Sequence, residues 1–435
     1  MAKPSRLPQR LALPPGQAGA PCLVAYSGGA DSTALLLLAV ESGLRDLRAV
    51  HIHHGLQTAA DDWAAHCQAL CAQLGVPLSV RRVQVSVDDP AGPEAAARNA
   101  RYAVFRELLP AGGLLLTAHH RGDQAETLLL RLLRGSGVEG LASIRSLTPF
   151  AGGWLWRPLL DQTRADLRAL VESRGLGWIE DPHNQSPRYA RAWLRSRLMP
   201  SLQQRWPEVE RQLAAAAGRC AEAAELLDEL AAALLPGLTR DDGGLSIIGL
   251  LGLSTAKRRL VLRHWLAQLD LPPAYDETFR HLDREVLTVR ADAEPLLRWP
   301  GGEFRRYRDA LYAGAPLPPL PADYAVDWDG LGDLELPAGC GVLRGRVARR
   351  LRVRLPRGGE RLRLHGASHH SSLRSLSQRQ GLPPWVRERL AIIEVDGELL
   401  SIAGRWTADP ERTGGAIQHW SGVLPPGLPL SWRQI

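Results

Sequence analysis

The first 160 or so residues alternate strand-like apolar runs with helical patterns, and this alternation constrains the fold more than any other feature. The candidate strands are Cys22 to Tyr26, Arg48 to His53, Leu78 to Val85 and Leu114 to Ala118. The candidate helices are Thr33 to Glu41, Asp61 to Leu74, Glu94 to Leu109 and Gln124 to Arg134. We therefore predict an α/β fold, a doubly wound and mostly parallel sheet with helices on both faces, and a ligand site at the carboxyl ends of the strands.

The rest of the chain is divided by changes in composition. A strand–helix pair around Leu155 to Trp156 and Thr163 to Arg174 closes the first domain, and from Pro207 the sequence becomes rich in Ala and Leu with helical spacing. A proline-rich stretch, Gly314 to Pro321, is typical of a stiff linker. We expect an N-terminal tail at 1–20, the α/β domain at 21–206, a helical domain at 207–313, a linker at 314–322 and a small mixed α+β domain at 323–435.

Charge is distributed unevenly near the C-terminus. Gly341 to Gln380 holds eleven Arg and one acidic residue, whereas Leu320 to Gly339 holds five acidic residues and no base. Leu351, Val353 and Leu355 alternate with arginines, so a strand there would have one apolar and one cationic face. A basic module after an acidic linker favours an anionic partner such as RNA. A merely solvated arginine-rich face is the alternative, since the chain has only two lysines.

Several classes of protein are disfavoured by composition. The longest apolar run near the start, Ala34 to Val40, is far shorter than the roughly 20 residues of a membrane span. The first 20 residues contain no apolar signal core, so we expect a cytoplasmic protein without membrane contact. The five cysteines are odd in number and scattered, which argues against a disulfide framework. Cys67 and Cys71 lack a second pair of zinc ligands, so buried thiols are expected there.

A glycine-rich loop, Ser27-Gly28-Gly29-Ala30-Asp31-Ser32, lies between the first predicted strand and the first predicted helix. Backbone N–H groups of such a loop can converge on an anion, and the helix N-terminus adds to the attraction. The loop lacks the lysine of a Walker A motif and the spacing of a dinucleotide fingerprint. We therefore expect it to bind a phosphate, with a simple helix cap as the alternative.

Two histidine-containing segments follow the second and fourth predicted strands. The first is His51-Ile52-His53-His54, and the second is His119-His120-Arg121-Gly122-Asp123-Gln124-Ala125-Glu126-Thr127. Asp123 and Glu126 are three residues apart at a helix start, so they share one face and could hold a metal ion or an ammonium group. The alternatives are ordinary N-terminal helix charge for the carboxylates and hydrogen-bonded packing roles for the histidines.

Arginines at helical spacing are candidates for RNA contact. Arg188, Arg191 and Arg195 form one stripe, and Glu94, Arg98 and Arg101 form a second group. Guanidinium groups suit phosphates and bases. A solvated helix face would give the same pattern.

Taken together, these motifs resemble a known family. The loop is similar to the pyrophosphate loop (PP-loop) of the N-type ATP pyrophosphatases. With the histidine segments and Trp178-Ile179-Glu180-Asp181-Pro182, the chain resembles the tRNA(Ile)-lysidine synthetases from about Cys22 to Leu202, and again at Gly381 to Arg387. The resemblance implies ATP and Mg²⁺ as cofactors and L-lysine and an isoleucine tRNA with a CAU anticodon as substrates. Lysine would be joined to C2 of the wobble cytidine through an adenylated cytidine, and a homodimer is compatible with this reading.

The resemblance also implies roles for individual residues. The catalytic residues would be Asp31, Asp123 and Glu126, with Asp31 and Asp123 as metal ligands. ATP would be bound by Ser27, Gly28, Gly29, Ala30, Asp31, Ser32, Ile52 and His53, and tRNA by Arg98, Arg101, Arg188, Arg191 and Arg195. The alternatives are a tRNA thiolase, a small-molecule amidating synthetase and an RNA-binding protein with a relict loop. The cysteine spacing and the arginine-rich module count against the first two.

Two departures from the family pattern limit this transfer. Relatives usually have two consecutive aspartates before the glutamine, and here Gly122 replaces the first. We expect Asp123 and Glu126 to suffice, Gly122 to let the loop approach the ligand closely, and Gly122→Asp to alter activity only a few fold. The segment from His369 to Arg374 replaces a lysine-rich one, which leaves open the residues that contact the tRNA acceptor end.

Overall fold

The computed structural model describes residues 10–55, 59–84, 92–180, 190–290, 293–346, 349–403, 406–408 and 417–420. The chain divides into two compact units, Met1–Leu226 and Leu227–Ile435, which are described separately. The boundary lies within helix α9 (Val209–Leu234). Among the described residues, no helix combines the length and the apolar character that a bilayer crossing requires.

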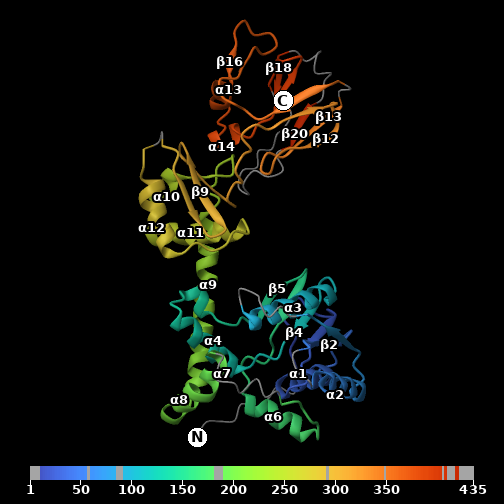
Figure 1. The fold of residues 1–435 in the computed structure, drawn as a ribbon. Helices are drawn as coiled ribbons and strands as arrows, with labels where there is room; N and C mark the ends of the chain where they lie inside the picture. Colours follow the sequence, from blue (N-terminus) through green and yellow to red (C-terminus); the bar gives the residue numbers. More distant parts are fainter. Residues whose placement is uncertain are drawn as a thin grey trace. The chain divides into compact units, whose positions relative to one another are not determined.

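The first unit is built on a six-stranded sheet with strand order β3-β2-β1-β4-β6-β5. Figure 1 labels β2, β4 and β5 of this sheet. All neighbouring pairs are parallel except β5 and β6, which are antiparallel. The doubly wound, mostly parallel sheet is therefore confirmed. The strands are β1 (Cys22–Ala25), β2 (Arg48–His53), β3 (Leu78–Arg82), β4 (Leu114–Leu116), β5 (Leu147–Phe150) and β6 (Gly153–Trp156).

Helices cover both faces of this sheet because both faces of its central strands are apolar. Val24 of β1 packs into one core cluster with Leu36 and Cys67, and Leu23 packs into another with Phe105. The first cluster draws on α1 (Ala30–Glu41), α2 (Ala60–Gln73) and α6 (Arg164–Ser173), the second on α3 (Pro93–Leu108). Sequence analysis did not anticipate β5, an edge strand whose half-exposed residues lack a continuous apolar run.

Further helices follow the fourth strand of the sheet. Helix α4 (Arg121–Leu133) begins shortly after β4 and is followed by the short α5 (Val138–Leu141). A second helical segment contains α7 (Ala190–Trp193), a π-helical turn η2 (Leu194–Leu198) and α8 (Met199–Arg205). Ala125 of α4 packs against Met199 and Val209, so α4 is held against α8 and the start of α9.

The second unit begins with helices and a four-stranded antiparallel sheet of order β7-β10-β9-β8. The helical prediction for 207–313 missed this sheet. Buried Glu303 and Arg306 interrupt the apolar alternation of β9, which explains the omission. The elements are α10 (Ile247–Gly252), α11 (Thr255–Gln268), α12 (Asp276–Leu282), η3 (Asp283–Leu287), β7 (Leu245–Ser246), β8 (Leu296–Trp299), β9 (Gly302–Tyr307) and β10 (Ala310–Gly314).

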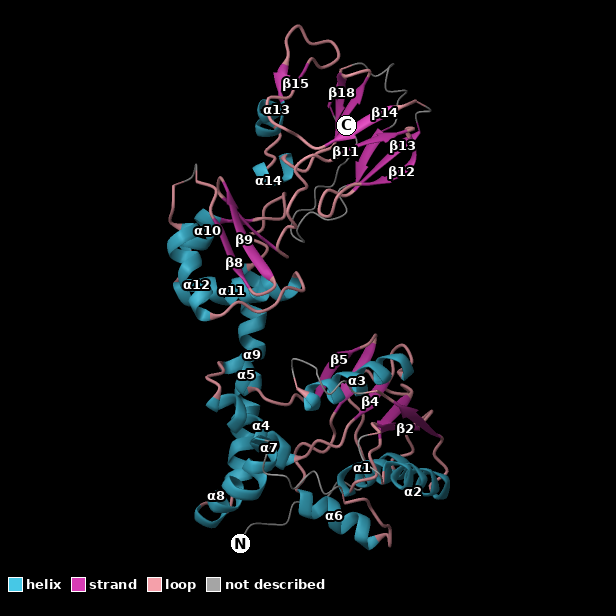
Figure 2. Ribbon diagram, viewed as in Figure 1, coloured by secondary structure: helices cyan, strands magenta, loops and turns pink. Residues whose placement is uncertain are grey.

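The C-terminal part of this unit is rich in short strands (Figure 2). A five-stranded sheet has the order β11-β14-β17-β18-β19, and a three-stranded sheet has the order β12-β13-β20. Two short helices accompany them, so the mixed α+β prediction is confirmed. The elements are β11 (Ala325–Trp328), β12 (Leu331–Glu335), β13 (Val342–Arg346), β14 (Leu351–Arg354), β15 (Arg361–Leu362), β16 (Ser371–Ser372), α13 (Leu373–Arg379), α14 (Pro384–Arg387), β17 (Ile392–Val395), β18 (Glu398–Ile402), β19 (Trp406–Thr407) and β20 (Ile417–Trp420).

The acidic stretch from Leu320 to Gly339 is not a linker, because it forms β11 and β12. Its carboxylates pair with arginines of the basic stretch: Asp327 with Arg350 at 2.7 Å and Asp333 with Arg344 at 3.1 Å. On β14, Leu351 and Val353 are buried as predicted, but Arg354 is paired with Glu394 and Glu360. Part of the predicted cationic face is therefore neutralised within the fold.

Candidate functional site

The predicted phosphate loop joins β1 to α1 at the carboxyl end of the sheet's central strand. Its hydroxyl groups bind one another: the Ser27 and Ser32 Oγ atoms are 3.0 Å apart, and Ser32 Oγ donates to the Gly29 carbonyl at 3.0 Å. Gly29 is the N-cap of α1, and no side chain occupies the capping position. Among the described residues, no side chain caps the N-terminal N–H groups of α1, so they are available to an anion. Phosphate binding by the loop stays a prediction.

Gly28 is held in place by a segment far along the chain. Its φ is +83°, and its carbonyl accepts a 2.8 Å hydrogen bond from the Ile179 N–H. A Cβ at this position would lie 2.4 Å from Ile179 Cδ1 and 2.8 Å from Cys67 Sγ. Only glycine therefore fits between the loop, α2 and the segment that contains Ile179.

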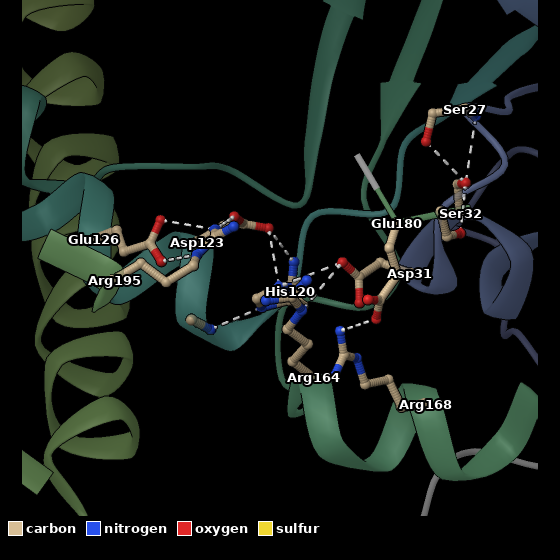
Figure 3. A network of polar contacts seen from close by, with 12 residues as sticks. Ser27, Asp31, Ser32, His120, Asp123, Glu126, Arg164, Arg168, Glu180 and Arg195 are labelled. Atoms are coloured by element: carbon tan, nitrogen blue, oxygen red, sulfur yellow. Dashed lines mark hydrogen bonds and ion pairs between the residues drawn. The ribbon is translucent and has the colours of Figure 1, made fainter. Parts of the chain in front are cut away.

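A second cluster forms at the start of α4, where two carboxylates meet an arginine of η2 (Figure 3). Arg195 binds Glu126 through two hydrogen bonds of 2.7 and 2.9 Å and Asp123 through one of 3.0 Å. Arg191 approaches Glu126 at 3.6 Å and donates to the Thr127 hydroxyl at 2.6 Å. The sequence prediction that Asp123 and Glu126 share one helix face is confirmed, and a single guanidinium contacts both.

The two carboxylates have different proton affinities. Burial opposes ionisation of Asp123, but His120, His119 and Arg195 outweigh it and lower the pKa of this carboxyl. Burial raises the pKa of Glu126, and the bonds from Arg195 offset only part of that effect. Two neighbouring carboxyls with separated pKa values are suited to different roles, one as a fixed charge and one as a proton acceptor.

His120 lies between the loop and the carboxylate cluster. Its Nε2 is 3.8 Å from Asp31 Oδ2 and 3.6 Å from Asp123 Oδ2. Arg164, the first residue of α6, reaches the same Asp31 oxygen at 3.9 Å. The polar groups of loop, α4, α6 and η2 therefore form one connected network (Figure 3).

Asp31 has one oxygen that fits a divalent cation. Its Oδ1 is buried and has no hydrogen-bond partner among the described residues. No three His, Cys, Asp or Glu side chains of the described ranges converge on a metal position, so a cation here would be shared with nucleotide phosphates. Both oxygens of Asp123 already have partners. A role of Asp123 as a metal ligand stays a prediction.

The residues of β2 predicted to bind ATP are engaged within the protein. His53 Nε2 is 3.2 Å from Asp61, and Ile52 packs against the cluster that includes Phe105. His51 is buried, with its Nδ1 3.1 Å from the Tyr26 carbonyl. These contacts agree with packing roles for the histidines. Nucleotide contact by Ile52 and His53 stays a prediction.

The arginines predicted to bind tRNA fall in separate places. Arg98 and Arg101 lie on α3, with their guanidinium carbons 4.8 and 6.0 Å from the centre of the Tyr102 ring. Arg191 and Arg195 lie at the carboxylate cluster. Some residues named in the sequence analysis fall outside the described residues: Val85, Asp181, Pro182, Arg188 and the side chain of Glu94.

Sequence reasoning missed the contacts of three residues. It did not predict that His120 connects the loop with the carboxylate cluster, or that Arg164 and Ile179 contact the loop. The only local signal was the position of His120 before a predicted helix. Arg164 and Ile179 reach the loop from later elements. Arg164 lies in no motif, and the motif Trp178–Pro182 that contains Ile179 did not indicate contact with the loop. Residues of this kind become visible only when the chain is folded.

Comparison with known proteins agrees with this geometry. Residues 8–202 match the PP-loop domain family, residues 245–312 the TilS substrate binding domain and residues 351–421 the TilS substrate C-terminal domain. A tRNA(Ile)-lysidine synthase of Xanthomonas campestris pv. campestris (strain 8004) is 45% identical over 433 residues, covering 98% of each chain. That of Methylococcus capsulatus is 40% identical over 424 residues, covering 92% of this chain and 95% of the relative.

Among solved structures, the U34-tRNA thiolase NcsA from Methanococcus maripaludis aligns with a TM-score of 0.39 and 16% identity, covering 47% of this chain and 72% of the other. That similarity is too low to carry an argument. The full-length identities, together with three matching domains in the same chain, are decisive. The chain belongs to the tRNA(Ile)-lysidine synthase family.

Proposed function

We propose that this protein joins L-lysine to C2 of the wobble cytidine of an isoleucine tRNA with a CAU anticodon. ATP is consumed, and lysidine, AMP and pyrophosphate are the products. The observation that carries the proposal is the connection, through His120, of a phosphate loop with a pair of buried carboxylates. The loop suits the phosphates of ATP, and the carboxylate pair suits the ammonium group of lysine. ATP and lysine are the two reactants that must reach the cytidine.

In the first step, the cytidine O2 attacks the α-phosphorus of ATP and pyrophosphate leaves. The backbone of Gly28 and Gly29 and the free N–H groups of α1 bind and orient the phosphates. Asp31, through its unpartnered Oδ1, would hold Mg²⁺ against these phosphates. When bound, the ion neutralises phosphate charge and favours departure of the pyrophosphate.

In the second step, the lysine ε-amine attacks C2 of the adenylated cytidine and AMP leaves. The ammonium must lose a proton before it can attack. Asp123, whose pKa is lowered, provides a fixed negative charge for the ammonium, and Glu126, whose pKa is raised, accepts the proton. For this to happen, lysine has to take over part of the bonding that Arg195 makes with the two carboxylates.

The thiolase alternative is disfavoured by the thiol nearest the loop. Cys67 is fully buried, with its Sγ 3.4 Å from His51 Nδ1. Burial raises the pKa of Cys67 to about 12, so the thiol stays protonated and unreactive at neutral pH. A cytoplasmic location and a homodimer remain predictions beside this proposal.

The test is one incubation of the protein with ATP, Mg²⁺, labelled lysine and total tRNA. Label should enter one isoleucine tRNA at the wobble cytidine, with one AMP released for each lysine incorporated. Incorporation of sulfur, or AMP formation without tRNA, would contradict the proposal. Omitting tRNA is the matched control.

A further inference from the structure

His120 occupies an unusual position for a histidine, the N-cap of α4. Its Nδ1 accepts a 3.0 Å hydrogen bond from the Gly122 N–H, and the His120 backbone N–H donates to Asp123 Oδ2 at 3.0 Å. Ser, Thr, Asp and Asn are the residues preferred for such a cap. Because Nδ1 accepts, the ring hydrogen is on Nε2, the atom that faces Asp31 and Asp123.

The ring can lie there only because residue 122 has no side chain. A Cβ on Gly122 would lie 2.8 Å from His120 Cε1 and 3.1 Å from its Nδ1. His120 is 3% exposed, so its ring has little room to move aside. An aspartate at 122 would also place a second negative charge near Glu210, whose Oε1 is 3.9 Å from the position of that Cβ. A side chain at residue 122 would therefore displace the His120 ring, and we expect Gly122→Asp to alter activity by more than the few fold expected from the sequence. Close approach of this glycine to a ligand stays a prediction.

We propose that His120 is a positioning residue, which holds Asp31 of the phosphate loop and Asp123 of the carboxylate cluster in register, and that Gly122 is required for it. This inference rests on the proposed function. It accounts for activity in this chain, in which Gly122 replaces the first of the two aspartates that relatives usually have. The Nε2–H donor lies 3.6 to 3.8 Å from its two carboxylates, close enough to form hydrogen bonds when substrates draw the site together.

Two substitutions of His120 separate its cap from its connection to the carboxylates. His120→Asn keeps a capping group near the position of Nδ1 but removes Nε2. His120→Gln places an amide N–H donor near the position of Nε2. We expect His120→Asn to melt within about 2 °C of the wild type yet to lower kcat for tRNA-dependent AMP formation at least about tenfold, with an unchanged KM for tRNA. His120→Gln should stay within about threefold of the wild-type kcat.

Gly122→Ala tests the second half of the proposal. It should lower kcat as much as His120→Asn, and the double variant should be no slower than either single one, because both changes remove the same contact. Gly218→Ala in α9, where a Cβ meets no atom within 4 Å, is the matched control and should behave as the wild type.

Each outcome has a distinct meaning. If His120→Asn turns over at the wild-type rate, His120 is only a helix cap and the inference is wrong. If the effects of His120→Asn and Gly122→Ala multiply, Gly122 acts independently of the histidine and the inference is again wrong. If the wild-type protein forms no AMP with tRNA, the proposed function itself fails, and the inference fails with it.

Discussion

The phosphate loop and the carboxylate cluster are connected, yet they are stabilised in opposite ways. The loop is held by neutral groups: hydroxyls that bind one another, a backbone hydrogen bond and a glycine packed against Ile179. The cluster is held by charge, with one guanidinium bound to two carboxylates. The loop leaves its N–H groups for an anion, whereas the cluster already contains a guanidinium that, on the proposed function, a substrate ammonium would have to replace. We therefore expect ATP to meet a prepared site and lysine to meet a competitor.

The largest expected effect comes from the loop. Asp31→Asn should abolish AMP formation, because it removes the negative charge from a carboxylate whose buried, unpartnered Oδ1 is suited to a cation. tRNA affinity should stay nearly unchanged, since we expect it to depend on arginines elsewhere. AMP release and filter binding of labelled tRNA measure the two quantities side by side. AMP formation at the wild-type rate would show that this loop is not the ATP site.

In the cluster, Asp123→Asn and Glu126→Gln should each slow lysine incorporation at least about a hundredfold, a typical contribution of one acid–base group. Glu126→Gln also leaves the Arg195 charge partly uncompensated, so its melting temperature should fall. Adding Arg195→Gln should restore stability without restoring incorporation. Recovery of both in the double variant would mean that the carboxylate only neutralises the arginine.

The comparison extends to the arginines of the second unit. Arg361 and Arg363 are exposed, and no carboxylate of the described ranges lies within 4.0 Å of either, whereas Arg344 and Arg350 have carboxylate partners. Arg361→Gln with Arg363→Gln should flatten the dependence of log tRNA affinity on log salt by about 0.7 to 0.9 per lost phosphate contact. Arg344→Gln with Arg350→Gln is the matched control and should change it less. Equal slopes in both variants and the wild type would mean that the arginines of this C-terminal region are solvated and do not contact RNA.

The smallest effect concerns His119, beside the cluster. Burial lowers the pKa of His119 to about 4 from an ordinary value of 6.5. The unfolded chain therefore binds the proton first as pH falls, so the stability due to this neutral histidine is complete above pH 6.5 and is lost toward pH 4. Between pH 7 and 5 the melting temperature should fall less in His119→Gln than in the wild type. Identical falls would show that His119 titrates normally.

The phosphate loop and the carboxylate cluster also differ in how far they could be predicted from the sequence. The loop was predictable because its glycines, its serines and Asp31 are consecutive and lie between a recognisable strand and helix. The spacing of Asp123 and Glu126 was also local, but their union with Arg195 depends on a contact about 70 residues away in sequence. The predicted arginine stripe assumed a regular helix, whereas the structure has a π-helical turn at Leu194–Leu198. Arg191 and Arg195 nevertheless both reach Glu126, and Arg188 lies outside the described residues. Sequence analysis also missed the sheet that contains β9, because buried charged residues of this strand obscure the alternation of apolar and polar residues that indicates a strand.

The hydrogen bond between Ile179 and Gly28 has a consequence for protein synthesis. A ribosome that makes roughly 5 to 20 residues per second needs about 8 to 30 s to proceed from Gly28 to Ile179. During that interval the nascent chain contains the complete glycine-rich loop but not Ile179, whose N–H donates to the Gly28 carbonyl. A prematurely terminated chain that ends before Ile179 would contain every residue of the loop and should still bind ATP poorly, so we expect competence for the nucleotide only after Ile179 has been made.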